Sequence, residues 1–323
     1  MLWHGLSHSL GIASRSLCPY DSGAQARMRE SRMKPNHEIS PELLENRGLF
    51  RDPFYQRFTL RAAAKPLQLT ESIQKDYLFP TFYGDVTCAM AIFLCPWERA
   101  AAMMPHPSFQ PVRMPGGRAA VAFSCYEYKQ VLGVPPYNEI AMTIPVLINP
   151  GLNIPLLPLI TPWFKNFGYY VFSMPVTSLE NQIRGVKIWG LPKVVQGIDV
   201  VESGGECVTT AYEESGEEYF RLRVPTTGTA TPFDVKSNLY SVREGKVEQS
   251  ETNFKATFNV TKFGGMLFGK SPVPERPYLT LGNTPSGQVI QGLELDPHPF
   301  QLRFARGVCS CFDFPNPGYT GPV

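Results

Sequence analysis

Lys193 is the residue whose surroundings in the sequence best fit a nucleophile. It follows Pro192, whose ring fixes its own backbone φ and pushes Leu191 toward an extended conformation, so the lysine leaves a rigid corner between a helix and a strand. Trp189 and Val194 on either side are apolar. If this corner faces inward, burial lowers the pKa of the amine, and a neutral amine attacks a ketone to form a Schiff base. If it faces outward, Lys193 is an ordinary exposed lysine at a turn.

Residues 264–271 (GGMLFGKS) match the residue pattern of a nucleotide phosphate-binding loop. Such a loop needs a helix directly after it, because the helix N-terminus and the backbone amides hold the phosphate. Pro272, Pro274 and Pro277 follow here and would interrupt that helix. The segment is therefore predicted to be a glycine-rich turn between strands.

The cysteines and histidines do not form the pattern of a metal site. No Cys-x-x-Cys pair is present, and Cys309 and Cys311 form an isolated Cys-x-Cys without a second half. We expect neither a metal nor a cofactor. The seven cysteines, an odd and scattered number, are interpreted as free thiols in a reducing compartment.

Two blocks of the sequence together resemble the acetoacetate decarboxylase family. The blocks are Trp189-Gly-Leu-Pro-Lys193, after a helix that ends in Gly-x-x-Ile, and Tyr137-Asn-Glu139 followed by Ile144-Pro145-Val146. The resemblance extends over roughly residues 85–200, apart from an apparent insertion at 149–168, and excludes residues 1–80. It implies a β-barrel-like α+β fold with an apolar central pocket, in an oligomer of identical chains.

The resemblance also implies roles for individual residues. Lys193 takes the place of the Schiff-base lysine, and Glu139 takes that of a pocket glutamate that transfers protons. Without the resemblance, Glu139 would be interpreted as a solvated carboxylate at a strand end. Trp189, Tyr137 and Phe123 are the residues that the resemblance implies for substrate binding.

Four places depart from the family pattern, one of which is Gly185-Val-Lys187, where the family has Gly-Arg-Glu. A second lysine usually follows the first, and Val194 stands there; Leu94 stands at an arginine position and Ser124 at a carboxylate position. Without the second lysine, desolvation alone must lower the pKa of the amine. Without the arginine, the substrate carboxylate loses its expected partner, for which Arg118 or Arg184 are the substitutes that the sequence offers.

The elements that must position these residues are mostly strands. Apolar and polar residues alternate as in half-buried strands, and the predicted strands are 86–94, 119–128, 140–148, 169–174, 194–201, 207–212, 219–224, 254–260, 288–295 and 301–308. Pro96 begins one predicted helix. A second helix is predicted to start at a capping box, Thr177-Ser-Leu-Glu180, and to end at Gly190 and Pro192. The fold class is therefore α+β and β-rich, an antiparallel barrel or strongly curved sheet with few helices.

The predicted organisation has four parts. Residues 1–36 form a flexible leader, 37–82 an N-terminal helical arm, 83–315 the barrel domain and 316–323 a tail. The leader contains no acidic residue before Asp21, which also fits a mitochondrial targeting segment. A disordered arm, or translation that begins at Met28 or Met33, remains an alternative.

Composition excludes several classes of protein. With 30 Lys+Arg against 28 Asp+Glu, the net charge is +2, which argues against a dedicated nucleic-acid binder. The most apolar stretch, 141–176, is interrupted by prolines and cannot supply the roughly 20 continuous apolar residues of a membrane span. We expect a cytoplasmic protein, with a mitochondrial location as the alternative, whose partner is a small keto compound and not a nucleic acid or a membrane.

The hypothesis that follows is a cofactor-independent Schiff-base lyase, most simply a decarboxylase of a β-keto acid. Aldol cleavage, condensation or dehydration through the same lysine iminium is the first alternative. A non-catalytic barrel that binds a small molecule, with Lys193 as part of the pocket wall, is the second. A structural subunit in which the N-terminal arm matters most is the third.

Overall fold

The structure is a computed structural model that describes residues 34–161 and 163–316 of the chain. Nearly all of the predicted leader, residues 1–33, and residues 317–323 of the predicted tail lie outside the described residues. Asn36, at the predicted end of the leader, forms a parallel bridge with Ser178.

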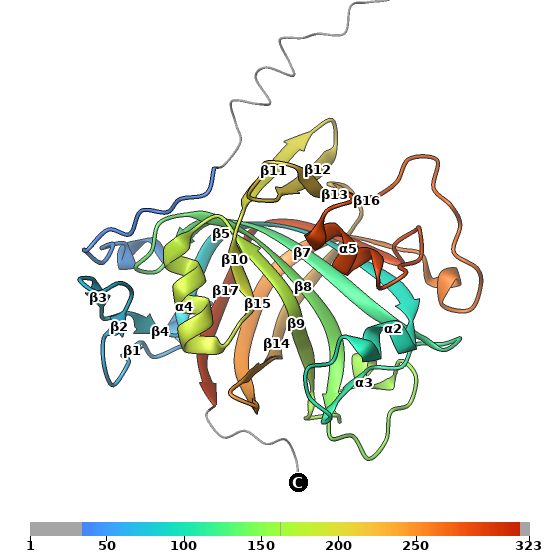
Figure 1. Ribbon diagram of the computed structural model, residues 1–323, viewed down its shortest axis with the longest axis horizontal. Coiled ribbons are helices and arrows are strands. Elements are labelled where there is room, and N and C mark those ends of the chain that lie inside the picture. The colour runs from blue at the N-terminus through green and yellow to red at the C-terminus, as the bar shows by residue number, and fades with distance from the viewer. Residues whose placement is uncertain (1–33, 162, 317–323) are drawn as a thin grey trace, which may run out of the picture. The chain divides into compact units, whose positions relative to one another are not determined.

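Seven strands form a closed barrel, as the sequence predicted (Figure 1). Their order around the ring is β9-β14-β15-β17-β5-β7-β8, and the pairing of β8 with β9 closes it. All these pairings are antiparallel except that of β14 with β9. The bounds are β5 Thr81–Pro96, β7 Arg118–Val131, β8 Tyr137–Ile148, β9 Phe167–Val176, β14 Thr229–Arg243, β15 Lys246–Lys262 and β17 Gln301–Asn316.

Side chains alternate between the two faces of the barrel wall, because successive residues of a strand point to opposite faces. On β5, Cys88 belongs to the cluster inside the barrel, whereas Ala89, Ala91 and Phe93 belong to a second cluster outside it. The inner cluster combines residues from strands that are not neighbours, such as Tyr126 of β7 and Phe258 of β15. The wall is therefore apolar on both faces, and each face has its own core.

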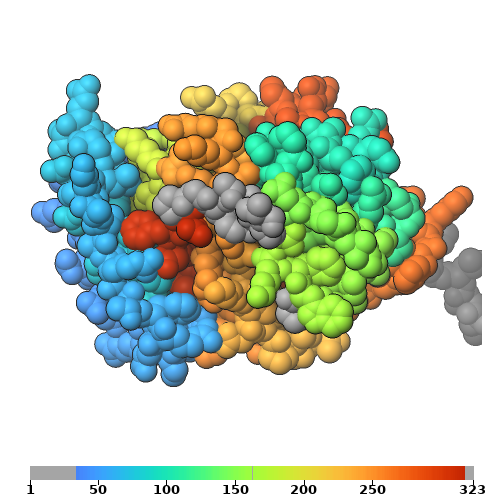
Figure 2. Space-filling view, turned by 90° about the horizontal axis from the view of Figure 1, so that it is seen from below, coloured from blue at the N-terminus to red at the C-terminus, as the bar shows by residue number. Residues whose placement is uncertain are grey.

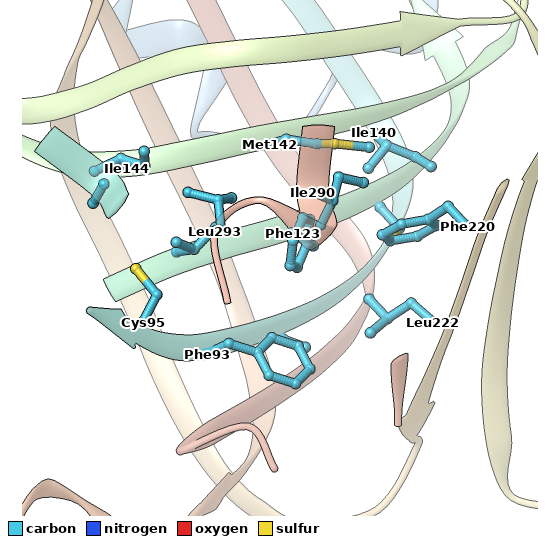
Figure 3. Close-up of a cluster of buried hydrophobic side chains, with 14 of the residues drawn as sticks. Phe93, Cys95, Phe123, Ile140, Met142, Ile144, Phe220, Leu222, Ile290 and Leu293 are labelled. Carbon is cyan, nitrogen blue, oxygen red and sulfur yellow. The ribbon is translucent and has the colours of Figure 1, made fainter. Parts of the chain in front are cut away.

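The outer core lies between the barrel and a four-stranded antiparallel sheet of order β11-β12-β13-β16. Figure 3 shows this cluster, in which Phe93 and Phe123 of the barrel face Phe220 and Leu222 of the second sheet and Ile290 of helix α5. The bounds are β11 Gly197–Ser203, β12 Glu206–Tyr212, β13 Glu218–Pro225, β16 Leu279–Leu281 and α5 Pro285–Gln291.

Short elements complete the described residues. The remaining helices are α2 Trp97–Ala102, α3 Leu157–Ile160 and α4 Leu179–Trp189, with 3-10 helices at Arg47–Leu49, Tyr55–Arg57 and Gly264–Leu267. The remaining strands are β1 Arg61–Ala62, β2 Leu67–Gln68, β3 Gln74–Lys75, β4 Leu78–Phe79, β6 Phe109–Pro111 and β10 Lys193–Val195. Among the described residues, no helix is long and apolar enough to cross a membrane.

The N-terminal arm contains two 3-10 helices and four two-residue strands where α-helix was expected. Tyr55 fixes the arm to the barrel by donating a hydrogen bond to the carbonyl of Tyr83 at 2.7 Å. In Figure 2 the arm, in blue, occupies one side of the face that is seen from below, and the residues between β8 and β9, in lime green, occupy the other.

Within the predicted barrel domain, two expectations about the elements were wrong and one strand was missed. Residues 288–295 are not a strand, because Thr284 caps a helix there and Pro285 occupies its first turn. Residues 194–201 are not one strand, because the chain leaves the barrel at β10 and enters the second sheet at β11. The long strand β14 was not predicted. The predicted turn at 264–271 is confirmed, since no α-helix follows Gly264–Leu267 before residue 279.

Candidate active site

Helix α4 and strand β10 occupy a place where the barrel wall divides. Strand β9 pairs with β14 only at Tyr169 and Tyr170, and farther along the same strand it pairs with β10 from Met174 to Val176. Strand β14 therefore separates from β9 at this end. After helix α4 the chain forms β10, which pairs with the edge of β9 that β14 leaves open (Figure 1). Lys193 is the first residue of β10 and so lies at this edge.

The start of α4 differs from the predicted capping box. Ser178, not Thr177, is the N-cap residue, and its hydroxyl accepts a hydrogen bond from the Asn181 amide. The Thr177 hydroxyl accepts one from the amide of Asn138 on β8 instead. The Glu180 carboxylate does not reach back to the helix start but forms a buried ion pair with Lys75 at 2.9 Å. This pair connects the N-terminal arm to the helix.

The end of α4 is the one that the sequence predicted. Gly190 adopts a left-handed conformation with φ of 61°, which ends the helix without strain. The Arg243 guanidinium of β14 donates to the carbonyl of Lys187, and the Ser241 hydroxyl donates to that of Trp189. Two carbonyls at the end of the helix thus accept hydrogen bonds from side chains of β14, and these bonds fix the corner before Lys193 against that strand.

Lys193 crosses α4 at Gly185. A Cβ atom at Gly185 would lie 2.3 Å from Cδ of Lys193 and 2.7 Å from Cε. Because glycine has no side chain, the Lys193 side chain can pass close to the helix at this position and reach the barrel interior. Its Nζ lies 2.5 Å from Oε2 of Glu139, and the two residues are 7% and 5% exposed. Lys193 is thus buried, and the interpretation as an exposed turn lysine is excluded.

Tyrosines surround the Lys193–Glu139 pair. The Tyr128 hydroxyl donates to the second oxygen of Glu139 at 3.2 Å, and Nζ of Lys193 lies 5.6 Å from the ring centre of Tyr137. Burial is the main cause that raises the pKa of Tyr83 to about 12 and those of Tyr128 and Tyr137 well above their ordinary value. These hydroxyls therefore stay protonated and act as hydrogen-bond donors at neutral pH.

Burial lowers the pKa of Lys193 below its ordinary value. The Glu139 carboxylate opposes this effect, and the Arg184 guanidinium adds to it. Arg184 is fully buried on α4, where it donates to the Thr81 hydroxyl at 3.0 Å and to the Asn181 side chain at 2.9 Å. A fixed cation near the lysine is thus present although Val194 replaces the second lysine.

Three of the departures from the family pattern, at Val194, Leu94 and Ser124, have structural consequences. Val194 is 44% exposed, so the side chain at this position points away from the barrel interior. Leu94 is buried in an apolar cluster with Met114 and Ala120. Ser124 is buried and pairs with Met90 and Ala141 on the inner face of the wall. Arg118 pairs with Asp296 and donates to three backbone carbonyls, so its charge is already matched.

The structure brings together three of the five residues expected at the site, namely Lys193, Glu139 and Tyr137. Trp189 lies behind them, stacked on Phe312 with ring centres 4.8 Å apart, and its indole N–H donates to the Asp313 carbonyl. It fixes α4 against β17.

Phe123 was expected to bind substrate, but the structure places it away from Lys193. It lies in the outer core, 5.5 Å from Phe220 between ring centres, on the face of β7 opposite Tyr126 and Tyr128 (Figure 3). The wall of the barrel thus separates it from Lys193. Tyr128 was not expected at the site, although the two-residue alternation from Tyr126 could have placed the two tyrosines on one face of the strand.

Three inward residues of β7 and β8 are less completely covered than their outward neighbours. Inward residues keep some accessible surface, with Ala141 at 8%, Thr143 at 7% and Ser124 at 5%. Their outward neighbours Ile140 and Phe123 keep none. These three residues are also smaller than the tyrosines that share the inner face with them.

Comparisons with known proteins found one matching family model and several similar solved structures. The family model described as acetoacetate decarboxylase matches residues 64–246. An acetoacetate decarboxylase structure from Legionella pneumophila shares 12% identity over 73% of this chain and 86% of its own, with a TM-score of 0.49. The enduracididine biosynthesis enzyme MppR, in complex with pyruvate, shares 13% identity over 78% of this chain and 96% of its own, with a TM-score of 0.47. No curated protein matches the chain.

Proposed function

This chain belongs to the acetoacetate decarboxylase family, and we propose that it is a lyase that forms a Schiff base with a keto compound through Lys193. The observation that supports this best is the position of Nζ, buried and 2.5 Å from a carboxylate oxygen of Glu139. A solvated lysine is protonated at neutral pH and does not attack carbonyls. Burial and Arg184 both favour the neutral amine here.

The first stage of the proposed reaction is the formation of the imine. The lone pair of Nζ attacks the keto carbon, and the carbonyl oxygen takes up two protons and leaves as water. Glu139 accepts first the proton that leaves the ammonium form of Nζ and then one from the attacking nitrogen, and it passes both to the departing oxygen, which its contact with Nζ makes possible. One hydrogen stays on the nitrogen of the iminium. The Tyr128 hydroxyl, bonded to the same carboxylate, orients it.

The second stage uses the positively charged iminium as an electron sink. For a β-keto acid, the bond to the carboxylate breaks, its electron pair moves toward the iminium nitrogen, and CO2 leaves. The resulting enamine takes a proton at carbon, and water then hydrolyses the imine to release the ketone and restore Lys193. Every electron pair is accommodated by the iminium, so no external electron acceptor takes part.

A second candidate is aldol cleavage, condensation or dehydration through the same iminium. The observation that favours it is Leu94, buried in an apolar cluster where the family resemblance places an arginine. Both candidates share the first stage and differ only in the bond that breaks afterwards.

Reduction with sodium borohydride tests the shared stage. The full chain is incubated with acetoacetate, pyruvate or acetone, reduced, digested and examined by mass spectrometry. We expect a reduced adduct on Lys193. Lys193→Arg should lose the adduct and the turnover but remain folded, whereas Lys187→Arg, on the neighbouring helix α4, should behave like the native chain.

The outcomes separate the alternatives. CO2 release from acetoacetate together with the adduct supports decarboxylation, and an adduct without CO2 release supports the second candidate. Binding of these compounds without any adduct, or turnover that survives in Lys193→Arg, would contradict the proposal and favour a non-catalytic binding barrel.

A further inference from the structure

A second cation, Arg303 on β17, faces the interior of the barrel. In the register of the sheet it lies opposite Val260 of β15 on one side and Met90 of β5 on the other. Directly paired residues of antiparallel strands point to the same face. Val260 belongs to the inner cluster, so Arg303 points inward as well.

Arg303 lies on the wall opposite the Lys193–Glu139 pair. Glu139 pairs with Tyr126 of β7, which pairs with Cys88 of β5, which pairs with Ala305 of β17. Arg303 comes two residues before Ala305, on the same face and about 7 Å farther along the strand. Strands β8 and β17 are three steps apart in a ring of seven, which is as far apart as two strands of that ring can lie.

The guanidinium of Arg303 has no carboxylate partner within the described residues. Its hydrogen bonds go from Nε and Nη2 to one neutral acceptor, the side-chain oxygen of Gln301, at 3.0 and 2.6 Å. Its Cζ lies 4.9 Å from the ring centre of Phe233. Tyr126, Tyr169 and Cys88 are near enough to affect it, and none of them is ionised at neutral pH.

This arrangement is unusual for an arginine in an enclosed place. A partly buried cation costs free energy unless an anion compensates it. Lys75 pairs with Glu180 and Lys193 with Glu139. Among the described residues Arg184 shares with Arg303 the lack of a carboxylate partner, but both of its Nη groups donate to protein oxygens. The Nη1 group of Arg303 donates to none of the described residues, so one edge of the guanidinium is available to a ligand.

We propose that Arg303 binds the carboxylate of the keto substrate inside the barrel while Lys193 reacts with its carbonyl from the opposite wall. This inference rests on the proposed Schiff-base function of Lys193. It identifies the substrate class as keto acids and not neutral ketones. It also assigns the carboxylate site to the last strand of the barrel, which lies beyond the residues 64–246 that the family model matches.

Two variants and two kinds of probe test the inference. The rate of borohydride-trapped adduct formation is measured against the concentration of the anions pyruvate, acetoacetate and levulinate and of the neutral ketones acetone and ethyl acetoacetate. In Arg303→Gln, the half-saturating concentration of the best anion should rise about 10- to 100-fold, the range expected for a charge-assisted hydrogen bond. That of the neutral ketones should change less than about twofold. Arg303→Lys should recover part of the affinity for anions.

Arg306→Gln is the matched control, because Arg306 lies on the same strand but is exposed and pairs with Glu202. It should leave both kinds of ketone unaffected. Equal losses for anions and neutral ketones in Arg303→Gln, or no loss for either, would overturn the inference. Circular dichroism of each variant establishes that it is folded.

A measurement without Schiff-base chemistry keeps the two proposals distinguishable. Butyrate contains a carboxylate but no ketone, so it should raise the melting temperature of the native chain and not that of Arg303→Gln. If no ketone forms an adduct with the native chain, the proposed function fails, and this measurement still decides whether Arg303 binds a carboxylate. An equal response to butyrate in both chains would refute the role of Arg303.

Discussion

Gly185→Ala should impair Schiff-base formation far more than stability. The new Cβ would lie 2.3 Å from Cδ of Lys193, whereas carbon atoms pack at about 3.5 Å or more, so the lysine chain must move by about 1.2 Å or more. The contact of Nζ with Glu139 would not survive this movement in its present geometry. A misplacement of about 1 Å can reduce a rate about 100-fold, which corresponds to about 2.7 kcal/mol.

The effect of Gly185→Ala on folding should be small because two contributions oppose each other. Alanine favours a helix interior by about 1 kcal/mol over glycine, and Gly185 lies inside α4. Overpacking costs about 1–3 kcal/mol. The net loss of stability is therefore about 0–2 kcal/mol, which thermal or urea unfolding can measure.

The assay compares the rate of borohydride-trapped adduct formation in Gly185→Ala with that in Val186→Ala. Val186 is exposed on the same helix, so its truncation should leave the rate unchanged. Native adduct formation in a folded Gly185→Ala chain would refute the description of Lys193 as a side chain that crosses α4 at the glycine.

Three other predictions concern the surroundings of the site. Glu139→Gln removes a negative charge that raises the pKa of Lys193. The trapping rate follows the fraction of free amine, so its rise with pH should move to lower pH in this variant. A shift to higher pH would contradict this sign. Val194→Lys places a cation on the outer side of β10. The pH profile of the trapping rate should therefore stay that of the native chain, and the free energy of unfolding should change by no more than about 0.5 kcal/mol. A shift of the profile to lower pH would show that this position acts on Lys193. Phe123→Ala should lower the free energy of unfolding, measured in urea, by about 3–5 kcal/mol because it truncates a side chain of the outer core. The KM for ketones should not change. A large increase in KM would show that Phe123 belongs to the substrate site after all.

The reactive pair could be predicted from the sequence because its signals are local. Pro192 and the apolar neighbours of Lys193 indicate a rigid, inward corner, and Gly190 indicates the end of the helix before it. Glu139 could be paired with Lys193 only through the resemblance to a family, since 54 residues separate them in the chain. The structure supplies the physical reason, which is that β8 and β10 both lie against β9.

The parts that could not be predicted depend on register between distant strands. Arg303 and Tyr128 acquire their neighbours through ladders that join β17, β5, β7 and β8, and a shift of one residue would turn either side chain outward. Strand β14 was missed because its solvent-facing residues and Pro232 weaken the alternation, whereas its long pairing with β15 compensates in the fold. At 288–295 the error was the opposite one, because a strand was predicted where none exists. Thr284 and Pro285 start a helix there, which the pattern of apolar residues alone does not indicate.

The position of β17 between β15 and β5 has a consequence for the synthesis of the protein. Strand β5 emerges early from the ribosome, but one of its two neighbours in the ring is the last strand to be made. Until residues 301–316 are available, the hydrogen-bonding edges of β5 and β15 remain open to pairing with other nascent chains. An incomplete chain that already contains Lys193 therefore has neither a closed ring nor Arg303, and chaperones that shield exposed strand edges should associate with it longest at this stage.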